Sequence, residues 1–324
     1  MPLRGKVGEI ATVEAALAGC NLTRGVALLA VESRRSAGYC KQFISWPVTR
    51  SRLEQSMNGS ALQEVSIATL RSFAIALPPT KIEQDAIAEV LSDTDALIES
   101  LEQLIAKKRH IKQGAMQDLL VGTRRPPGFD DSWELMQLGV LTDMMSGGTP
   151  LSSTPAYYDG DIPWVSISDM TRCGKVIEFT DRNLSREGLA SSAARIFPAG
   201  TVLYAMYASL GECAIAGTSL CSSQAILGIR PKANLNNEFL YYHLTSTKNV
   251  VKSMGQQGTQ ANLNKGMVQA FQINLPPLPE QTAIATILSD MDAELAALEA
   301  KLAKTRQLKQ GMMRELLTGR IRLV

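Results

Sequence analysis

Apolar residues recur alternately four and three positions apart along two stretches of the chain. This spacing places them on one stripe of a helix and is typical of the seam of a coiled coil. In the C-terminal stretch the stripe consists of Ile284, Leu288, Met291, Leu295, Leu298 and Leu302. In the middle of the chain it consists of Ile87, Leu91, Ile98, Leu101 and Ile105, with Thr94 at the remaining position. The pattern predicts two long helices whose stripes bury against each other.

These two stretches are copies of one sequence block. The first begins LPPTKIEQ at Leu77 and the second begins LPPLPEQ at Leu275. When Gln84 is aligned with Gln281, more than half of the positions that follow are identical, which shared helical composition does not explain. Proline disfavours the helical conformation of the residue before it, so each helix is expected to begin after its last proline.

The charges within each copy are ordered. Acidic residues such as Glu99 and Glu102 come first, and basic residues such as Lys107, Lys108 and Arg109 follow. This order suits the dipole of a single helix without any partner. Between neighbouring helices, parallel pairing would set like charges together, whereas antiparallel pairing sets acid against base. We therefore predict an antiparallel coiled coil, which charge reversal at Glu99 and Glu102 should weaken.

The regions around the helical blocks have a mixed pattern. Short apolar runs at 162–167, 200–207 and 225–229 predict strands, whereas 238–254 has the period of an amphipathic helix. The expected fold class is α/β, with mixed α/β globules joined to the two long helices. The expected divisions are a partial first globule (1–76), a first helix (77–125), a complete second globule (126–274) and a second helix (275–324).

A fainter repeat relates the two globules. Val7-Gly8-Glu9 parallels Leu210-Gly211-Glu212, and the segment 23–29 falls where 223–227 does. Residues 1–76 thus correspond to the second globule from about Met206 onward. We expect the first globule to lack its front part and to expose apolar residues that this part would cover, namely Val26, Leu28, Leu29 and Ile67.

Composition limits the class of protein. The chain has 324 residues, 45% of them hydrophobic, and a net charge of +2, so any nucleic-acid surface would have to be a local patch. No apolar run is long enough to span a membrane, and the N-terminus has no signal-peptide pattern. The five cysteines form no CxxC pair. These features predict a reduced protein of the cytoplasm with no membrane partner.

Motifs that carry out catalysis are missing from the sequence. There is no GxxxxGK loop, no glycine-rich dinucleotide or methyl-donor loop after a strand, and no HExxH. The two histidines, His110 and His243, lie in helical segments and are interpreted as residues of helix faces. We therefore expect no catalytic residue, no metal ligand and no cofactor bound by this chain.

Four short motifs lie in the second globule, namely SGGTP (146–150), IPWV (162–165), SQ (223–224) and GTQANL (258–263). Both long helices contain the patterns IxxxLSDxD and KQGxM. Together with the duplicated helix, these motifs resemble the specificity subunit of Type I restriction-modification enzymes. The resemblance extends over essentially the whole chain and rests on the order of these motifs more than on any one of them.

The resemblance implies a division of labour between subunits. In this family each recognition domain reads one half of a bipartite DNA target, and the paired helices set the spacing of the domains. The helices also dock modification subunits, which carry the methyltransferase, and restriction subunits join that core. S-adenosylmethionine, ATP and Mg would then be bound by partner subunits. Because the first globule departs from the family by lacking its front part, a scaffold that binds modification subunits without reading DNA is the alternative.

Candidate DNA contacts fall into two groups. A polar loop after the predicted helix 238–254 carries amides and hydroxyls that would read base edges, or would simply form a turn and a cap; its residues are Gln256, Gln257, Thr259, Gln260 and Asn262. A polar stretch carries cations that would contact phosphates, or would form a solvated loop; these are Arg172, Lys175, Arg182 and Arg186. Trp164, Tyr204 and Tyr207 are either stacking residues or parts of buried strands.

Overall fold

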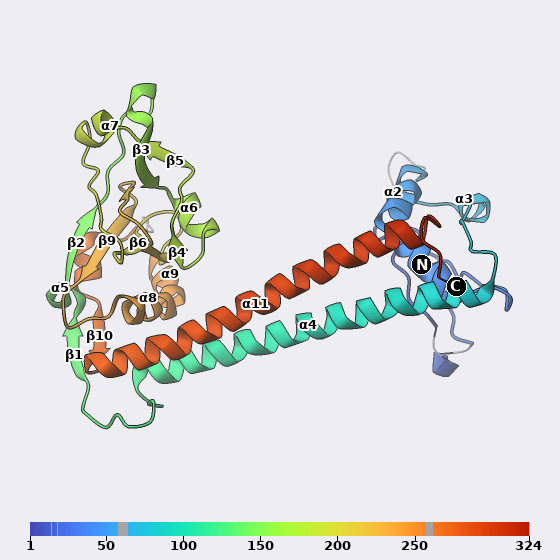
Figure 1. The fold of residues 1–324 in the computed structure, drawn as a ribbon, viewed down its shortest axis with the longest axis horizontal. Helices are drawn as coiled ribbons and strands as arrows, with labels where there is room; N and C mark the ends of the chain where they lie inside the picture. The colour runs from blue at the N-terminus through green and yellow to red at the C-terminus, as the bar shows by residue number, and fades with distance from the viewer. Residues whose placement is uncertain (14, 18, 58–63, 257–261, 324) are drawn as a thin grey trace. The chain divides into compact units, whose positions relative to one another are not determined.

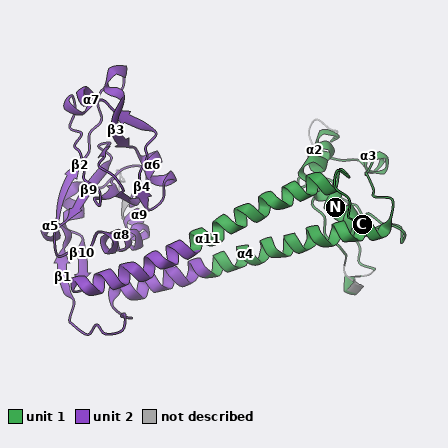
Figure 2. Ribbon diagram, in the orientation of Figure 1, with its two compact units in different colours: residues 1–107, 295–324 green, residues 108–294 purple. Residues whose placement is uncertain are grey.

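The computed structural model describes residues 1–13, 15–17, 19–57, 64–256 and 262–323 (Figure 1). The chain forms two compact units, which are coloured separately in Figure 2. Unit 1 contains residues 1–107 and 295–324, and unit 2 contains residues 108–294. Two long helices, α4 (Lys81–Val121) and α11 (Leu278–Leu316), contribute residues to both units. This division differs from the four segments expected from the sequence, which remain a prediction.

Within each unit, α4 and α11 run antiparallel. Ion pairs join them so that the residue numbers rise along one helix while they fall along the other. The pairs are Asp95–Lys309 and Glu102–Arg306 in unit 1, and Lys108–Glu294 and Lys112–Asp292 in unit 2. Acidic residues of one copy thus face basic residues of the other, which confirms the predicted antiparallel pairing.

The predicted seam residues differ in burial. Six are fully buried, namely Ile87, Leu91, Leu101, Ile105, Ile284 and Leu288. Five are half-buried, namely Ile98, Met291, Leu295, Leu298 and Leu302. Near the start of each long helix the globular part of the same unit packs over the seam, through Tyr39 and Phe43 in unit 1 and Phe239 and Tyr242 in unit 2. A second helix alone covers only one stripe, so most of the other seam positions keep some exposure, although Leu101 and Ile105 in the middle of α4 are buried.

A five-stranded sheet forms the centre of unit 2. Its order is β2-β9-β6-β7-β4, and every pairing is antiparallel except that of β7 with β4. The strands are β2 (Thr142–Ser146), β4 (Val176–Ile177), β6 (Val202–Ala205), β7 (Cys213–Ala216) and β9 (Ile226–Pro231). All side chains of β6 and β7 are buried because apolar clusters cover both faces of the sheet.

Two smaller sheets and short helices complete unit 2. One sheet has the order β5-β3-β8, with β3 (Tyr158–Val165), β5 (Arg182–Leu184) and β8 (Cys221–Ser222). The other pairs β1 (Glu134–Gln137) with β10 (Gln272–Leu275). The short helices are α5 (Leu138–Leu141), η2 (Pro155–Tyr157), α6 (Ile167–Arg172), α7 (Arg186–Ala190) and α10 (Lys265–Gln269). The expected α/β class is confirmed, and the three predicted strands correspond to β3, β6 and β9.

The single helix expected over 238–254 is wrong. The structure has two helices, α8 (Asn237–Ser246) and α9 (Lys248–Gln256), separated at Thr247. The hydroxyls of Thr245, Ser246 and Thr247 all donate to carbonyls of the preceding turn. Such bonds compete with the helical hydrogen bonds of the backbone, and three in succession favour a break.

Unit 1 builds its globular part from short helices. These are η1 (Ala15–Leu17), α1 (Ala37–Ser45), α2 (Pro47–Gln55) and α3 (Ile67–Ser72). Among its described residues, β pairing is limited to the isolated bridges Pro2–Val26 and Arg4–Glu64. Leu28, Leu29 and Ile67 are exposed as expected, whereas Val26 is half-buried. Of all the helices described in either unit, none combines the length and apolarity that a membrane span requires.

Candidate functional site

A buried glutamine at the start of each long helix makes the same contacts in both units. In unit 1, Gln84 accepts a hydrogen bond from the Ser36 amide at 3.0 Å and donates to the Pro78 carbonyl at 2.8 Å. In unit 2, Gln281 accepts from the Asn236 amide at 2.8 Å and donates to the carbonyls of its own proline loop and of Asn234. Ser36 and Asn236 are the N-caps of α1 and α8. Each glutamine therefore connects its long helix to a short helix of the globular part and to the proline-containing loop before the long helix.

The neighbouring glutamate forms a second repeated contact. Arg125, in the tail of α4, binds both carboxylate oxygens of Glu280 at 2.7 and 2.6 Å, and Trp133 donates to the same carboxylate at 3.0 Å. Arg322, in the tail of α11, binds Glu83 in the same bidentate way. The hydrogen bond from Arg322 is the main cause that lowers the pKa of Glu83. Each contact ties the tail of one long helix to the start of the other.

The LSDxD and KQG motifs meet in a third repeated contact. In unit 1, Gln42 donates to Ser92 and Asp95, and Lys309 binds the same aspartate. The matching residues of unit 2 are Tyr242, Ser289, Asp292 and Lys112, with the same connections. We call these three contacts together the junction. The sequence contains a signal for the junction, because each of its residues on the long helices occurs in both copies. The order of charged residues predicts the pairing of the helices but does not predict these contacts with the globular parts.

Lys175, a predicted phosphate contact, lies within the junction of unit 2. Its ammonium donates to Tyr242 at 3.1 Å and to Ser289 at 2.7 Å, and it forms an ion pair with Glu238 at 3.3 Å. The Lys175 side chain is 19% exposed. The ammonium is therefore engaged by groups of α8 and α11.

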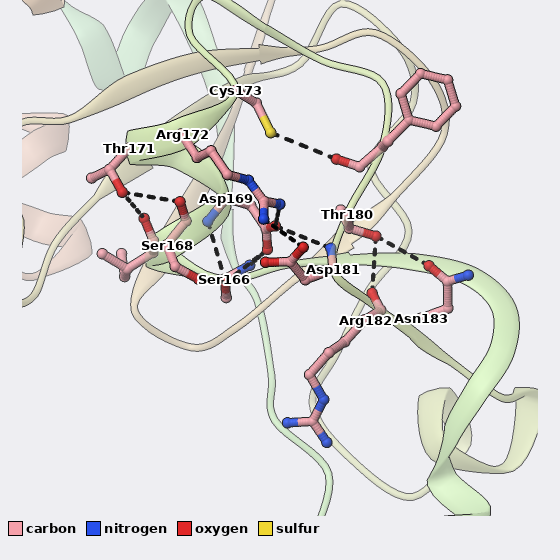
Figure 3. Close-up of polar contacts among 12 residues, drawn as sticks. Ser166, Ser168, Asp169, Thr171, Arg172, Cys173, Thr180, Asp181, Arg182 and Asn183 are labelled. Carbon is pink, nitrogen blue, oxygen red and sulfur yellow. Dashed lines mark hydrogen bonds and ion pairs between the residues drawn. The ribbon is translucent and has the colours of Figure 1, made fainter. Parts of the chain in front are cut away.

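Arg172 is the last residue of α6 and lies beside a buried carboxylate that organises the segment after this helix (Figure 3). Asp169 is completely buried and accepts from Ser166 at the N-cap of α6, from Arg172 at 3.0 Å and from the Asp181 amide at 3.1 Å. Arg172 also forms an ion pair with Asp181 at 2.6 Å, and this hydrogen bond is the main cause that raises the pKa of Arg172. The loop from 172 to 181 is thus fixed at both ends.

Arg182 has aromatic partners instead. Its guanidinium lies 4.0 Å from the centre of the Tyr158 ring and points away from the Asp169 network in Figure 3. Beneath it, Tyr158 donates to the Pro150 carbonyl and Trp164 donates to the Gly148 carbonyl. Trp164 is buried in β3, which supports its interpretation as a strand residue rather than a stacking one. Tyr204 is also fully buried, in β6.

The SGGTP segment contacts the SQ segment closely. A Cβ atom on Gly147 would lie 2.2 Å from the Ser222 carbonyl oxygen, and one on Gly148 would lie 2.1 Å from the Ala194 nitrogen, so both positions require glycine. This approach presents the exposed side chains of Thr149 and Gln224, and the Thr149 hydroxyl donates to the Gln224 amide oxygen. Sequence reasoning noted both motifs but assigned neither side chain to a DNA contact.

The predicted polar loop is described only at its edges. Gln257, Thr259 and Gln260 lie outside the described residues. Gln256 is the last residue of α9, and Asn262 is exposed. The amide of the next residue, Leu263, donates to the carbonyl of Met206 at 3.0 Å, and the residue after Met206 in the chain is the 36% exposed Tyr207. The cap of the following helix α10 is supplied by Asn264, after the predicted loop.

The two histidines show no arrangement for catalysis. His110 is exposed on α4. His243 is half-buried on α8, and burial lowers its pKa to about 4, so its imidazole is neutral at physiological pH. The described residues contain no group of three or more His, Cys, Asp or Glu that would hold a metal ion.

The chain is similar to curated specificity subunits from Methanocaldococcus jannaschii. It is 31% identical over 164 residues to the Type I restriction enzyme MjaIX specificity subunit, a match that covers 49% of this chain and 38% of that protein. It is 27% identical over 282 residues to the putative MjaX specificity subunit, covering 83% and 64% respectively. The matches therefore span less than two thirds of the length of either relative.

The fold is also that of a solved structure. The Type I restriction-modification S subunit from M. genitalium superposes with a TM-score of 0.62 at 15% identity, covering 87% of this chain and 73% of that one. The family model described as the Type I restriction modification DNA specificity domain matches residues 32–107 and 130–309. Since this match takes in most of the chain and falls on both copies of the repeat, the chain belongs to the Type I restriction modification DNA specificity family.

Proposed function

We propose that this chain is the DNA sequence-recognition subunit of a Type I restriction-modification complex. Unit 2 reads a half-site of a bipartite target, and the paired helices dock the modification subunits, through which restriction subunits join. The chain itself is non-catalytic, and S-adenosylmethionine, ATP and Mg are bound by the partner subunits in the cytoplasm. The observation that carries the proposal is the family match over both copies of the repeat, and the surface of unit 2 supports it.

The two arginines of unit 2 are unequal as phosphate ligands. Arg182 stacks on Tyr158, so its guanidinium is held in place, and none of the described residues forms an ion pair with it. Arg172 is shared between Asp169 and Asp181, which leaves that group of three with a net negative charge. A phosphate contact from Arg182 would therefore contribute more binding free energy than one from Arg172, because the guanidinium of Arg182 is already oriented and its charge is not already paired with a carboxylate among the described residues.

Base reading is assigned to exposed amide and hydroxyl groups of unit 2. Gln224 is oriented by Thr149, and Asn262 precedes Leu263, whose amide binds the carbonyl of Met206. A glutamine or asparagine amide pairs in a bidentate way with the edge of adenine in the major groove. Together with Arg182, these side chains provide both kinds of contact that sequence recognition needs, one to position the duplex and one to read it.

Subunit docking is assigned to apolar residues on the outer faces of the long helices. Ile111 on α4 is 46% exposed, and Leu308, at the equivalent position of α11, is 56% exposed. Val90, Leu97 and Leu104 of α4 are also exposed. An apolar residue outside the seam at the same place in both copies fits a surface that partner proteins cover.

The test is a selection of DNA duplexes from a random pool by the chain assembled with its modification subunits. We expect enrichment of one defined half-site, and Arg182→Ala should weaken binding to all duplexes and reduce the salt dependence of log K by about one unit. Sequencing the methylome of the host with and without the gene checks the same target in cells. Equal affinity for all duplexes, together with intact binding of modification subunits, would instead identify a scaffold.

A further inference from the structure

The ammonium of Lys175 belongs to a closed polar network in unit 2. The ammonium binds Tyr242, Ser289 and Glu238, and the Ser289 hydroxyl in turn donates to Glu238 at 2.8 Å. Tyr242 donates to Asp292 at 2.7 Å, and that aspartate binds Lys112. The Lys175 ammonium also lies 4.7 Å from the centre of the Tyr242 ring. Every polar atom of this network is matched by another of the same unit.

The charges of the network balance. Lys175 and Lys112 are offset by Glu238 and Asp292. Burial raises the pKa of Tyr242, so its phenol remains protonated and acts as the donor to Asp292. A network without net charge attracts phosphate weakly, and moving the ammonium onto a phosphate would leave Glu238 without its ion-pair partner.

Lys175 lies at the edge of the central sheet. It immediately precedes β4, the two-residue strand at the sheet edge, and its carbonyl accepts from the Ile215 amide of β7 at 2.7 Å. Arg172, at the end of α6, precedes Lys175 in the chain, and Arg182, at the start of β5, follows β4. The Lys175 side chain therefore joins β4, the strand between the two arginines in the chain, to α8 and α11.

Unit 1 contains the same junction without this addition. Gln42, Asp95 and Lys309 make the contacts of Tyr242, Asp292 and Lys112. Gly38 occupies the position in α1 that Glu238 occupies in α8, counted from the N-caps. In the part of unit 1 that the structure describes, no lysine takes the place of Lys175. The junction is thus complete without Lys175, whose contacts serve the attached sheet.

We propose that Lys175 is a positioning residue for DNA recognition: it holds β4, the edge strand that lies between Arg172 and Arg182 in the chain, at a fixed orientation on α8 and α11, and does not contact DNA itself. The inference rests on the proposed function and deepens it. It replaces the phosphate contact expected from the sequence with a role that acts through the neighbouring arginines.

The test uses the full chain, assembled with modification subunits, and three variants. Lys175→Met keeps the aliphatic stem and removes the ammonium, and Glu238→Gln weakens the same network from the other side. Lys232→Met is the matched control, because it removes a lysine charge of unit 2 whose ammonium is exposed and binds only the Val140 carbonyl among its described partners. Affinity is measured for the selected duplex and for a scrambled one over a range of salt concentrations, together with the melting temperature.

In Lys175→Met both arginines remain and can still meet the phosphates of any duplex, but no longer in the one register that base reading requires. A positioning role therefore predicts that Lys175→Met weakens the selected duplex about tenfold, leaves the scrambled duplex nearly unchanged and keeps the salt slope of the wild type. Glu238→Gln should act in the same direction with a smaller effect. Equal weakening of both duplexes with a slope reduced by about one would show a phosphate contact and overturn the inference. A lower melting temperature with an unchanged ratio of affinities would show a purely structural lysine and overturn it too. If the wild type does not discriminate, the proposed function fails, and this inference with it.

Discussion

Unit 1 and unit 2 use the two copies of one helical block in the same way, yet they carry different globular parts. The buried glutamine, the arginine-bound glutamate and the Ser-x-x-Asp contact recur in both junctions. In unit 2 a five-stranded sheet is attached, whereas the described residues of unit 1 show only isolated bridges in its place. The contacts made by the long helices are therefore common to both units, and the units differ in the globular parts attached to them.

Those differences fall at matching positions of α1 and α8. Phe43 stands where unit 2 has His243, Gln42 where it has Tyr242, and Gly38 where it has Glu238. Gln42 and Tyr242 nevertheless reach the same pair of long-helix residues. Both units thus place a hydrogen-bond donor at the end of this side chain, although one donor is an amide on an aliphatic chain and the other a hydroxyl on an aromatic ring.

The largest expected effect tests whether the two junctions are equivalent. Gln281→Leu removes the buried side-chain amide and leaves its three partners, the Asn236 amide and the carbonyls of Asn234 and Pro276, without these bonds, so it should destabilise unit 2 by about 3 kcal/mol. Gln84→Leu removes one bond fewer and should cost unit 1 about 2 kcal/mol. Hydrogen exchange resolved by peptide measures both. If either variant loosened both units equally, the junctions would not be independent.

The next effect separates the units by pH. His243 titrates near 4 in the folded unit and near 6.5 when unfolded, so the folded state binds fewer protons between these values. The contribution of neutral His243 to the free energy of unfolding of unit 2 is therefore fully present above about pH 6.5. It falls by roughly 2 to 3 kcal/mol as the pH drops to 4. Unit 1 has Phe43 at this place and should lack this component.

His243→Phe converts unit 2 to the arrangement of unit 1 and should remove that part of the pH dependence. His110→Gln, at an exposed position of α4, is the control and should leave it unchanged. Urea unfolding of each variant between pH 4 and 7 measures the difference. A pH profile of His243→Phe that matched the wild type would assign the dependence to other groups.

A smaller effect concerns the glycine that the two globules share. Gly8 and Gly211 both have positive φ, at 84° and 77°. Alanine at Gly8 would bring its Cβ to 2.5 Å from Cγ of Arg50, near the base of that side chain, whereas at Gly211 the nearest atom is Cγ of Lys248 at 3.2 Å. Gly8→Ala should cost about 2 kcal/mol and Gly211→Ala about 1 kcal/mol, by thermal unfolding. Equal costs would mean that backbone strain alone decides both.

The helix pair was predictable because its signals are local and repeated. Seam spacing and charge order act within a few residues, and the duplication made both visible twice. The role of Lys175 was not predictable, because its partners Tyr242 and Ser289 lie 67 and 114 residues away along the chain. The break at Thr247 was missed for a different reason: apolar periodicity continues across it, and the three hydroxyls that favour it do not alter that period.

The smallest effect tests the antiparallel pairing on which both units depend. Glu102 forms an ion pair with Arg306 of the other helix at 2.5 Å, while Glu99 contacts Gln103 of its own helix. Charge reversal at both glutamates was expected to weaken the pairing. Glu102→Lys should cost about 0.5 kcal/mol more than Glu99→Lys, and the difference is small because the Glu102–Arg306 pair is half exposed and screened by solvent. Adding Arg306→Glu to Glu102→Lys should restore the loss in a double-mutant cycle measured by urea unfolding. A coupling energy of zero between 102 and 306, at low salt, would mean that the apolar seam alone sets the direction of the helices.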